Sequence, residues 1–508
     1  MGKITVGNRY SKIEGLPTPY VEEAIRRELS YQVQNYFHMP AFKERGWDGY
    51  INLLEADGLF MSGLLSLVRG VLDATKTPYE VEDVRTKSEP NFPELTFTPP
   101  PDYQERPYQK FTVDRALRFT RGILRVATGG GKTMIVTEMI GRLKVRPFLF
   151  FVLTRDLLIQ AHDELERCLN APIGMVGDGR MDIQDITVCT VQTLVACLHR
   201  NDKGFNPKDY RYDAEDVWDE TKFLSEGDSE RVVALMRESR GFYFDEVHHA
   251  AAKTCKEVVF ACENAFYRYG GSATPQRDDG EDLVVQGLFG KKVVDISATY
   301  LMDQGYLVRG HVFLTNRDPS AEGETTYGAI YKKVVVENED FNGQVAALVR
   351  FLTGNGVPCL LLVQQIPHGK LLKRFLPEAE YLTGRDSGKK RKKAIDRMRS
   401  GELKVLIATT LADEGLDIKP IQAVFMLSAG ASVTRVPQRI GRCLRLWEGK
   451  KFGMFVYFRH RVKYLFEQGH DVQKILAAEP GFVVHKAHDF GELRQSIVKL
   501  MNSTENLL

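Results

Sequence analysis

The sequence carries almost no net charge. Its 69 lysines and arginines are balanced by 67 aspartates and glutamates, which leaves +2 at pH 7. No global electrostatic field therefore attracts a polyanion, and any affinity for nucleic acid must come from local patches. Long apolar runs are missing too: Phe148 to Leu153 is far too short to cross a bilayer, and Met1 to Lys12 has no apolar signal-peptide core. We expect a cytoplasmic protein without a membrane partner.

Cysteine is scarce and irregularly spaced. Seven cysteines lie between Cys168 and Cys443, and no two are spaced as Cys-x-x-Cys. An odd number without that spacing argues against a disulfide framework. His248, His249 and Cys255 are neighbours in the chain, but no fourth ligand accompanies them and structural zinc needs four. We expect no zinc site.

Length and composition are those of a soluble multidomain protein. Of 508 residues, 43% are hydrophobic and 27% are charged, and this length predicts about three domains. Repeated prolines between Asn91 and Pro107 prevent regular helix and favour an extended tether. The predicted domains are 1–100, a small accessory or DNA-binding domain; 101–305, a first lobe with an acidic insertion at 200–231; 306–470, a second lobe; and 471–508, a helical extension.

Short apolar strands alternate with helix-prone stretches twice along the chain. The first series runs from Gly122 to about Ile296, and the second from near Leu360 to Phe458. This alternation is typical of a doubly wound parallel sheet. The insertion has ten acidic and six basic residues, so we expect a solvated segment, or one that docks on a partner, and no DNA-facing surface. The predicted fold class is α/β, with two parallel-sheet lobes in tandem after a small α+β domain.

A glycine-rich turn follows the first apolar strand of the first lobe. Between a strand and a helix, such a turn directs backbone N–H groups at a polyphosphate, while a lysine reaches the β- and γ-phosphates and a hydroxyl holds magnesium. The strict P-loop pattern has glycine at the position of Val126, so this turn matches a shorter variant. The candidate residues for ATP and Mg²⁺ are Thr128, Gly129, Gly130, Gly131, Lys132 and Thr133.

An Asp-Glu pair, Asp245 and Glu246, comes directly after the apolar strand 241–244. Ligands of open parallel sheets bind at the carboxyl ends of strands. We assign Asp245 to magnesium and Glu246 to the attacking water, which together with Lys132 is the division of labour that phosphoryl transfer requires. Ser272, a small hydroxyl residue beside these carboxylates, is expected to relay the nucleotide state. An isolated Asp-Glu pair is usually a solvated turn, but its position after a buried strand favours catalysis.

Two arginines, Arg442 and Arg445, are three residues apart on a predicted helix, so that both guanidinium groups would lie on one face. Charge that develops on a γ-phosphate needs planar donors that are always ionised. The accompanying Gln438 and Gly441 favour a catalytic role over an ordinary basic helix face. Because these residues are far along the chain from Lys132, we place them in the second lobe.

Together these motifs resemble the superfamily 2 helicases, whose two RecA-like lobes bind ATP between them and nucleic acid across their tops. The resemblance implies that Arg106 and Gln109 read the adenine, with a bidentate amide contact to N6 and N7. It also implies that Gly415 and Asp417 contact the nucleotide. The nucleic-acid contacts that it implies are Thr154, Arg155, Thr190, Gln192, Gln364, Thr409 and Thr410.

Within that superfamily the sequence is most similar to the UvsW-type phage recombination helicases, and more distantly to XPB-like motors. The segments 46–54, 63–65, 368–370 and 468–471 carry this likeness. It implies ATP-driven remodelling of branched DNA with 3′-to-5′ polarity: fork regression, branch migration, and unwinding of D-loops and R-loops. The implied partners are branched, forked or single-stranded DNA and recombination or replication proteins. A monomer is plausible, and a phage-encoded protein would act in the host cytoplasm.

Two other functions stay open. No residue visibly reads or rejects a 2′-hydroxyl, so an RNA-remodelling enzyme fits the same motifs. A DNA-binding clamp that uses ATP only as a gate, without processive unwinding, fits them as well.

Two local patterns also allow alternatives. Aromatic residues between Tyr31 and Tyr50 lie near Lys43 and Arg45 in the chain. Either they stack on unpaired bases, or they form the core of the small domain, as large rings usually do in small domains. The run Lys389–Lys393 is five consecutive cations. It is either a plain exposed helix face or a phosphate contact with salt-dependent affinity.

Overall fold

The computed structural model describes residues 1–34, 36–44, 46–101, 103–202, 224–274, 280–409, 418–427, 435–477 and 479–505. The chain divides into two compact units, one of residues 1–126 with 131–295 and the other of 127–130 with 296–508. Most of the acidic insertion and the predicted contacts Thr410, Gly415 and Asp417 lie outside the described residues.

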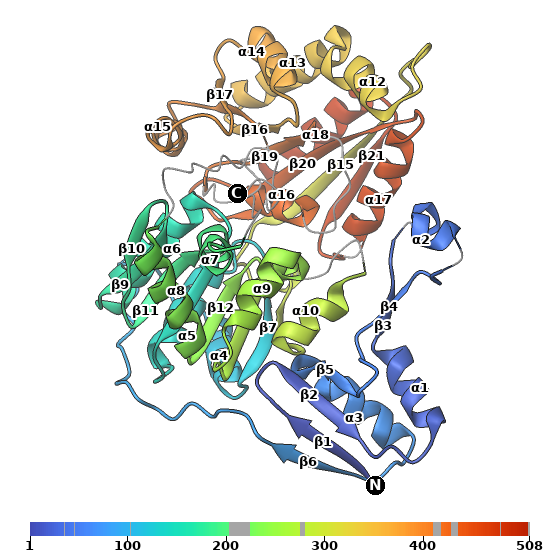
Figure 1. Ribbon diagram of the computed structural model, residues 1–508. Helices are drawn as coiled ribbons and strands as arrows, with labels where there is room; N and C mark the ends of the chain where they lie inside the picture. The colour runs from blue at the N-terminus through green and yellow to red at the C-terminus, as the bar shows by residue number, and fades with distance from the viewer. Residues whose placement is uncertain are drawn as a thin grey trace. The chain divides into compact units, whose positions relative to one another are not determined.

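The first unit opens with a small sheet in the order β5 (Leu59–Met61), β2 (Tyr10–Glu14), β1 (Gly2–Val6) and β6 (Tyr79–Asp83). β1 is antiparallel to β2 and parallel to β6. Helices α1 (Pro19–Glu28) and α3 (Leu65–Ala74) pack with this sheet around aliphatic side chains such as Ile4, Ile25 and Val68 (Figure 1). A separate ribbon of β3 (Ser30–Gln32) and β4 (Tyr50–Asn52) leads to the short helix α2 (Pro40–Lys43).

An extended segment joins this small domain to the large sheet of the same unit. Between β6 and residue 106, the described residues contain no helix or strand. The segment is held by backbone hydrogen bonds: the N–H of Asn91 donates to Lys144 O at 2.8 Å, and that of Thr98 to Cys168 O at 2.7 Å. The prolines thus produce an extended tether that lies along the first lobe.

The large sheet of the first unit has eight strands, and its pairings from β9 to β7 are parallel. The strands at its centre consist mostly of buried apolar residues, as expected when helices cover both faces. Its strand order is β10 (Arg180–Asp182), β9 (Ile173–Gly177), β11 (Ile186–Thr190), β8 (Phe148–Val152), β12 (Gly241–Asp245), β13 (Tyr267–Ser272), β7 (Arg121–Val126) and β14 (Lys292–Ile296). Its helices are α4 (Pro107–Leu117), α5 (Lys132–Arg142), α6 (Arg155–Leu169), α7 (Val191–Leu198), α8 (Glu226–Glu238), α9 (Lys253–Ala261) and α10 (Asp282–Phe289).

The second unit is built on a seven-stranded sheet whose pairings are all parallel. Its strand order is β17 (Glu380–Leu382), β18 (Val405–Ala408), β16 (Cys359–Leu362), β19 (Ala423–Met426), β20 (Phe452–His460), β15 (Arg309–Arg317) and β21 (Val483–Ala487). Its helices are α11 (Ala298–Asp303), α12 (Tyr327–Tyr331), α13 (Glu339–Gly354), α14 (Ile366–Phe375), α15 (Gly388–Arg399), α16 (Arg435–Leu444), α17 (Leu465–Ala477) and α18 (Phe490–Glu505).

Two parallel sheets after a small α+β domain confirm the predicted fold class. The expected helical extension, 471–508, contains the edge strand β21 as well as α18. Its exposed Val483 and Val484 pair with β15, so this segment completes the second sheet. In the described part of the chain, none of the helices has both the length and the apolar character that crossing a bilayer needs.

Candidate functional site

The glycine turn lies between β7 and α5, as predicted. Gly129 and Gly131 have φ angles of 84° and 76°, in the left-handed region that favours glycine. A Cβ on Gly131 would also lie 2.3 Å from Gln109 Nε2. Backbone conformation and space therefore both exclude side chains here, which leaves the bare backbone that a phosphate cradle requires.

Lys132, the first residue of α5, forms ion pairs with both predicted carboxylates. Its Nζ lies 2.8 Å from Asp245 Oδ1 and 2.8 Å from Glu246 Oε1. Asp245 ends β12, in register with Gly271 of β13. All three charged side chains are less than one fifth exposed. The fold thus gathers the predicted phosphate-binding lysine and the predicted magnesium and water ligands at one point.

The pKa values within this triad depend on burial and on mutual charge. Burial alone would lower the pKa of Lys132, but the two carboxylates outweigh it and raise that pKa. Burial raises the pKa of Asp245, although Lys132 acts against that shift. Burial would also raise the pKa of Glu246, but Lys132 and His248 outweigh it and hold the value at about 2. Glu246 is therefore ionised near neutral pH, as a proton acceptor must be.

Glu246 is held in an unusual backbone conformation, with φ 50° and ψ 56°. Such left-handed geometry costs energy in a residue other than glycine, and it is concentrated at functional sites. The Ser272 hydroxyl, at the end of β13, donates to Glu246 Oε2 at 3.0 Å and accepts from the Thr274 N–H at 3.1 Å. Its Oγ also lies 3.1 Å from His248 Nδ1. Ser272 therefore connects Glu246 to the segment after β13, which is the connection that a relay of nucleotide state needs.

The predicted adenine-reading residues lie at the start of α4, beside the glycine turn. Gln109 Oε1 accepts from the Arg106 N–H at 2.9 Å and from the Tyr103 hydroxyl at 2.6 Å. A carbonyl oxygen has two lone pairs, and both are used here. The predicted bidentate contact to adenine therefore requires Gln109 to give up one of these bonds. Tyr103 was not a sequence candidate, because nothing in the tether pattern distinguishes it.

The nucleic-acid candidates of the first lobe meet at the ends of two neighbouring strands. Val152 of β8 pairs with Thr190 of β11, so the segments that follow lie side by side. The Thr154 hydroxyl caps α6 by accepting from the Leu157 N–H at 3.3 Å, and the Gln192 amide donates to Leu153 O. These two side chains are engaged within the lobe.

Arg155 is the most exposed of these candidates. Its side chain is 62% exposed, although its Nε lies 2.6 Å from Asp178 Oδ2. In contrast, Thr190 is buried and donates to the Thr193 hydroxyl at 2.8 Å. The structure thus leaves Arg155 as the candidate of this group best placed to contact a polynucleotide.

In the second unit, the candidates follow β16 and β18, which are parallel neighbours. Gln364 is exposed after β16. Thr409 is fully buried after β18, with its N–H donating to Leu382 O at 3.2 Å. In this conformation the Thr409 hydroxyl is not presented to a polynucleotide.

Helix α16 carries the predicted catalytic group of the second unit. Gln438 and Arg442 are both buried on it. The helix ends at Leu444, and Arg445 instead forms an isolated antiparallel bridge with Leu307. The prediction that both arginines lie on one helix is therefore wrong for Arg445, because its backbone leaves the helix to pair with that neighbouring segment.

His368, which belongs to the family-like segment 368–370, has a structural role between two helices. His368, on α14, is buried, and its Nε2 lies 2.8 Å from Asn342 Oδ1 on α13. The Asn342 amide donates in turn to Val335 O and Asn338 O, both at 2.8 Å. This network holds α14 against α13.

We expect His368 to make the protein less stable in acid. Burial lowers its pKa from 6.5 to about 4, so between these values the unfolded chain binds a proton that the folded chain does not. Stability is complete above pH 6.5 and falls as pH decreases towards 4, by about 1–3 kcal/mol from this group. His368→Gln keeps a donor for Asn342 but does not titrate. Urea unfolding at about pH 7.5 and about pH 5 should show a smaller loss in the variant; equal losses would contradict the assignment.

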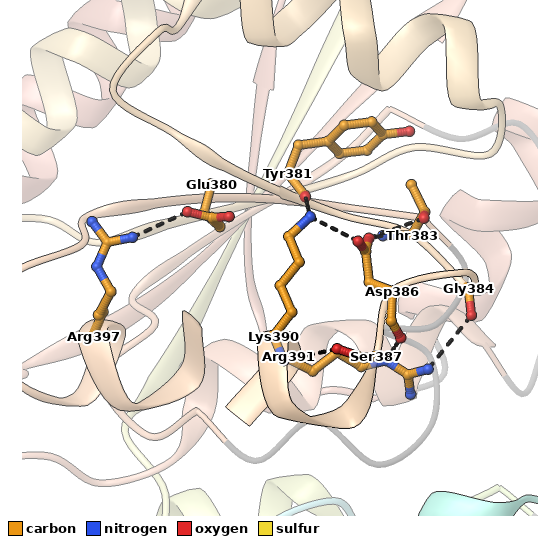
Figure 2. Close-up of polar contacts among 9 residues, drawn as sticks. All are labelled: Glu380, Tyr381, Thr383, Gly384, Asp386, Ser387, Lys390, Arg391 and Arg397. Atoms are coloured by element: carbon orange, nitrogen blue, oxygen red, sulfur yellow. Dashed lines mark hydrogen bonds and ion pairs between the residues drawn. The ribbon is translucent and has the colours of Figure 1, made fainter. Parts of the chain in front are cut away.

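Two residues of the run of five cations, Lys390 and Arg391, bond to the turn before α15 (Figure 2). Lys390 Nζ lies 2.7 Å from Asp386 Oδ1, and Arg391 Nε donates to Asp386 O at 3.0 Å. Asp386 also accepts from the N–H and the hydroxyl of Thr383, at 2.7 and 3.0 Å. Ser387 caps α15 by accepting from the Lys390 N–H. Lys390 and Arg391 therefore brace the turn before α15.

The other three lysines of the run face solvent. Lys389, Lys392 and Lys393 are exposed, and none of them forms an ion pair within the described residues. We call these three the α15 lysines. They provide a local concentration of positive charge on a chain with almost no net charge.

Two family models match the chain. Residues 99–277 match the model described as "Type III restriction enzyme, res subunit", and residues 343–446 match "Helicase conserved C-terminal domain". The first match includes the glycine turn and the carboxylates, and the second includes α16. Each predicted ATPase motif of the described chain therefore falls within a matched region.

Several relatives share these regions. "Putative helicase 22" of a Sulfolobus islandicus filamentous virus is 30% identical over 44% of this chain and 43% of its own length. "DNA 3′-5′ translocase XPB2" of Sulfurisphaera tokodaii is 25% identical over 67% of this chain and 78% of its own. "ATP-dependent DNA helicase uvsW" of Enterobacteria phage T4 is 22% identical over 83% of each. The chain thus spans less than half of the viral relative.

Among solved structures, an "ATP-dependent Type ISP restriction-modification enzyme LlaBIII bound to DNA" is similar over 78% of this chain and 32% of its own, with a TM-score of 0.53 at 15% identity. This likeness supports the fold. The two family models and the UvsW and XPB relatives confirm the predicted resemblance. The chain belongs to superfamily 2 of the helicases.

Proposed function

We propose that this protein hydrolyses ATP to move along DNA as a helicase or translocase, and that it remodels branched DNA with 3′-to-5′ polarity. The observation that carries the proposal is the pairing of Lys132 with both Asp245 and Glu246 next to a bare glycine turn. The names of two relatives, a DNA 3′-5′ translocase and an ATP-dependent DNA helicase, support DNA as the track. Branched DNA follows from the UvsW-type resemblance.

The triad suggests how nucleotide binding would activate Glu246. In this structure the Lys132 ammonium forms ion pairs with both carboxylates. Magnesium-bound ATP would supply the γ-phosphate and a second cation, held by the glycine turn, Thr133 and Asp245. Lys132 would then turn to the phosphates, and Glu246 would be left to accept the proton of the attacking water. Ser272, which donates to Glu246, would keep the carboxylate oriented during that exchange.

We propose that Gln438, Arg442 and Arg445 contact the γ-phosphate in the same reaction. Arginine donors stabilise charge that spreads over the transferred phosphoryl group. Burial lowers the pKa of Arg445, with a further effect from Arg399, but only to about 10. The group therefore remains a cation at neutral pH.

We assign the α15 lysines to a contact with the DNA backbone. Replacing all three with alanine should lower the slope of log affinity against log salt by about 2 on single-stranded DNA, because each neutralised phosphate contributes roughly 0.7. A matched variant removes the exposed lysines Lys404, Lys486 and Lys499, with the same change in net charge. An equal loss of slope in both variants would show a general charge effect and would contradict a contact at α15.

The proposed function is tested by comparing ATP hydrolysis in the presence of forked DNA, single-stranded DNA, duplex DNA and RNA of equal length. We expect the strongest stimulation by forked DNA. Stronger stimulation by RNA would favour an RNA-remodelling enzyme, and hydrolysis without strand displacement in a single-turnover assay would favour a clamp. Displacement on substrates with only a 3′ or only a 5′ tail then tests the polarity.

A further inference from the structure

The aromatic residues near the N-terminus do not form the core of the small domain. That core is aliphatic, built from side chains such as Ile4, Ile13 and Leu72, with Phe60 as its buried ring. Of the aromatic residues between Tyr31 and Tyr50, only Tyr31 packs against it. The expectation that these rings form the core is therefore wrong, because the β3–β4 ribbon carries them away from the sheet (Figure 1).

Residues 36–44 and 46–50, which we call the aromatic tip, have a defined internal structure. Tyr36 covers the backbone of Gly49, where a Cβ would lie 2.4 Å from Tyr36 Cδ2, and its ring meets Phe42 edge-on with centroids 4.8 Å apart. The Trp47 indole N–H donates to Tyr50 O at 2.7 Å, and Asp48 Oδ1 accepts from the Tyr50 N–H at 3.0 Å. Some rings of the tip therefore build it.

Other rings of the tip are offered to solvent. Phe37 is 50% exposed and Tyr50 is 48% exposed, although exposing large rings forfeits the stabilisation that burying them would provide. Beside them lies an open pocket of about 730 Å³, within the size range of sites for small planar ligands. Its lining consists of Phe37, Phe42, Lys43, Gly46, Trp47 and Asp48.

The charges of the aromatic tip indicate which kind of ligand it binds. Lys43 is exposed and forms no ion pair within the described residues. The Asp48 carboxylate is engaged by the backbone of its own turn. Exposed rings next to an available cation are the combination that binds unpaired nucleotides, because the rings stack on bases while the cation neutralises phosphate.

We propose that the aromatic tip is a second nucleic-acid site, which stacks Phe37 and Trp47 on unpaired bases of single-stranded DNA while Lys43 contacts the backbone. This proposal rests on the proposed function, since it requires a DNA substrate. It gives the small domain the task of holding the single-stranded part of a junction.

The first test measures affinity for a dT oligonucleotide and for an abasic oligonucleotide with the same number of phosphates. Phe37→Ala should weaken dT binding about tenfold and leave abasic binding unchanged, whereas Phe37→Tyr should keep wild-type affinity. The matched control is Tyr20→Ala, which removes a ring that is 74% exposed on α1 of the same domain and should change neither affinity. Unchanged dT binding in Phe37→Ala would overturn the proposal, as would an equal loss on the abasic strand.

The second test observes stacking directly. The chain has three tryptophans, so Trp218→Phe with Trp447→Phe leaves Trp47 as the only indole. Its fluorescence should be quenched by dT but not by the abasic strand. Absence of quenching by dT would overturn the proposal, and self-association that is lost in Phe37→Ala would assign the tip to a protein contact instead.

If DNA stimulates ATP hydrolysis while both tests fail, only the tip proposal fails; if no nucleic acid stimulates hydrolysis, the proposed function fails.

Discussion

Replacing Glu246 with glutamine, or Lys132 with alanine, is expected to abolish nucleic-acid-stimulated ATP hydrolysis. Glutamine keeps the shape and the acceptor for Ser272 but cannot take a proton, so the rate should fall by about 10²–10⁴. Lys132→Ala removes the only charged group that contacts both carboxylates in the described structure. It also removes the predicted contact to the β- and γ-phosphates. Steady-state phosphate release with saturating DNA measures both effects.

The two variants differ in their expected effect on the fold. Lys132→Ala leaves Asp245 and Glu246 buried without their shared cation, which costs stability, so thermal unfolding must be measured beside activity. Glu246→Gln removes one buried negative charge and should unfold near the wild-type temperature. Glu238→Gln, an exposed carboxylate on α8, makes the same charge change and should keep full activity. Hydrolysis at the wild-type rate in Glu246→Gln would remove Glu246 from the role of general base.

Replacing Arg442 with alanine is expected to preserve ATP binding and to lower turnover by about 10³ or more. A contact that strengthens only as charge develops on the γ-phosphate contributes to the transition state and adds little to the ground state. Titration with a non-hydrolysable ATP analogue measures the ground state, and steady-state phosphate release measures the rate. The prediction thus concerns the difference between two quantities measured on one variant.

Arg442→Lys is the matched control for geometry. It keeps the positive charge but loses the planar fork of the guanidinium, so we expect only partial recovery of turnover. If the alanine variant lost affinity for the analogue while its turnover stayed normal, Arg442 would be a ground-state binding residue. Because Arg442 is buried on α16, unfolding of each variant must also be measured, and a variant that does not fold does not test the role.

Parts of the site could be predicted because they depend on short stretches of chain. Asp245 was expected at the end of a buried strand, and the register of β12 with β13 places it there. The strands β15 and β21 were not predicted. β15 mixes His311, Thr315 and Asn316 with apolar residues, and β21 has exposed valines at the sheet edge, so neither shows the continuous apolar pattern of the central strands.

Other features could not be predicted because they depend on contacts between distant segments. The carbonyl of Gln109 is occupied by Tyr103, which is part of the tether. Arg445 leaves its helix to pair with Leu307. Thr409 is fully buried at the end of β18. None of these contacts has a signature in the local sequence.

Local residue patterns were enough to predict the fold class, the glycine turn and the position of the carboxylates, since periodicity and backbone freedom are local properties that depend directly on residue type. The folded structure was needed to show that one ammonium pairs with both carboxylates, that two of five adjacent cations brace a turn while three face solvent, and that the N-terminal rings lie outside the core. The physical reason is that burial and charge pairing depend on which remote segments meet, and that information is spread over the whole chain.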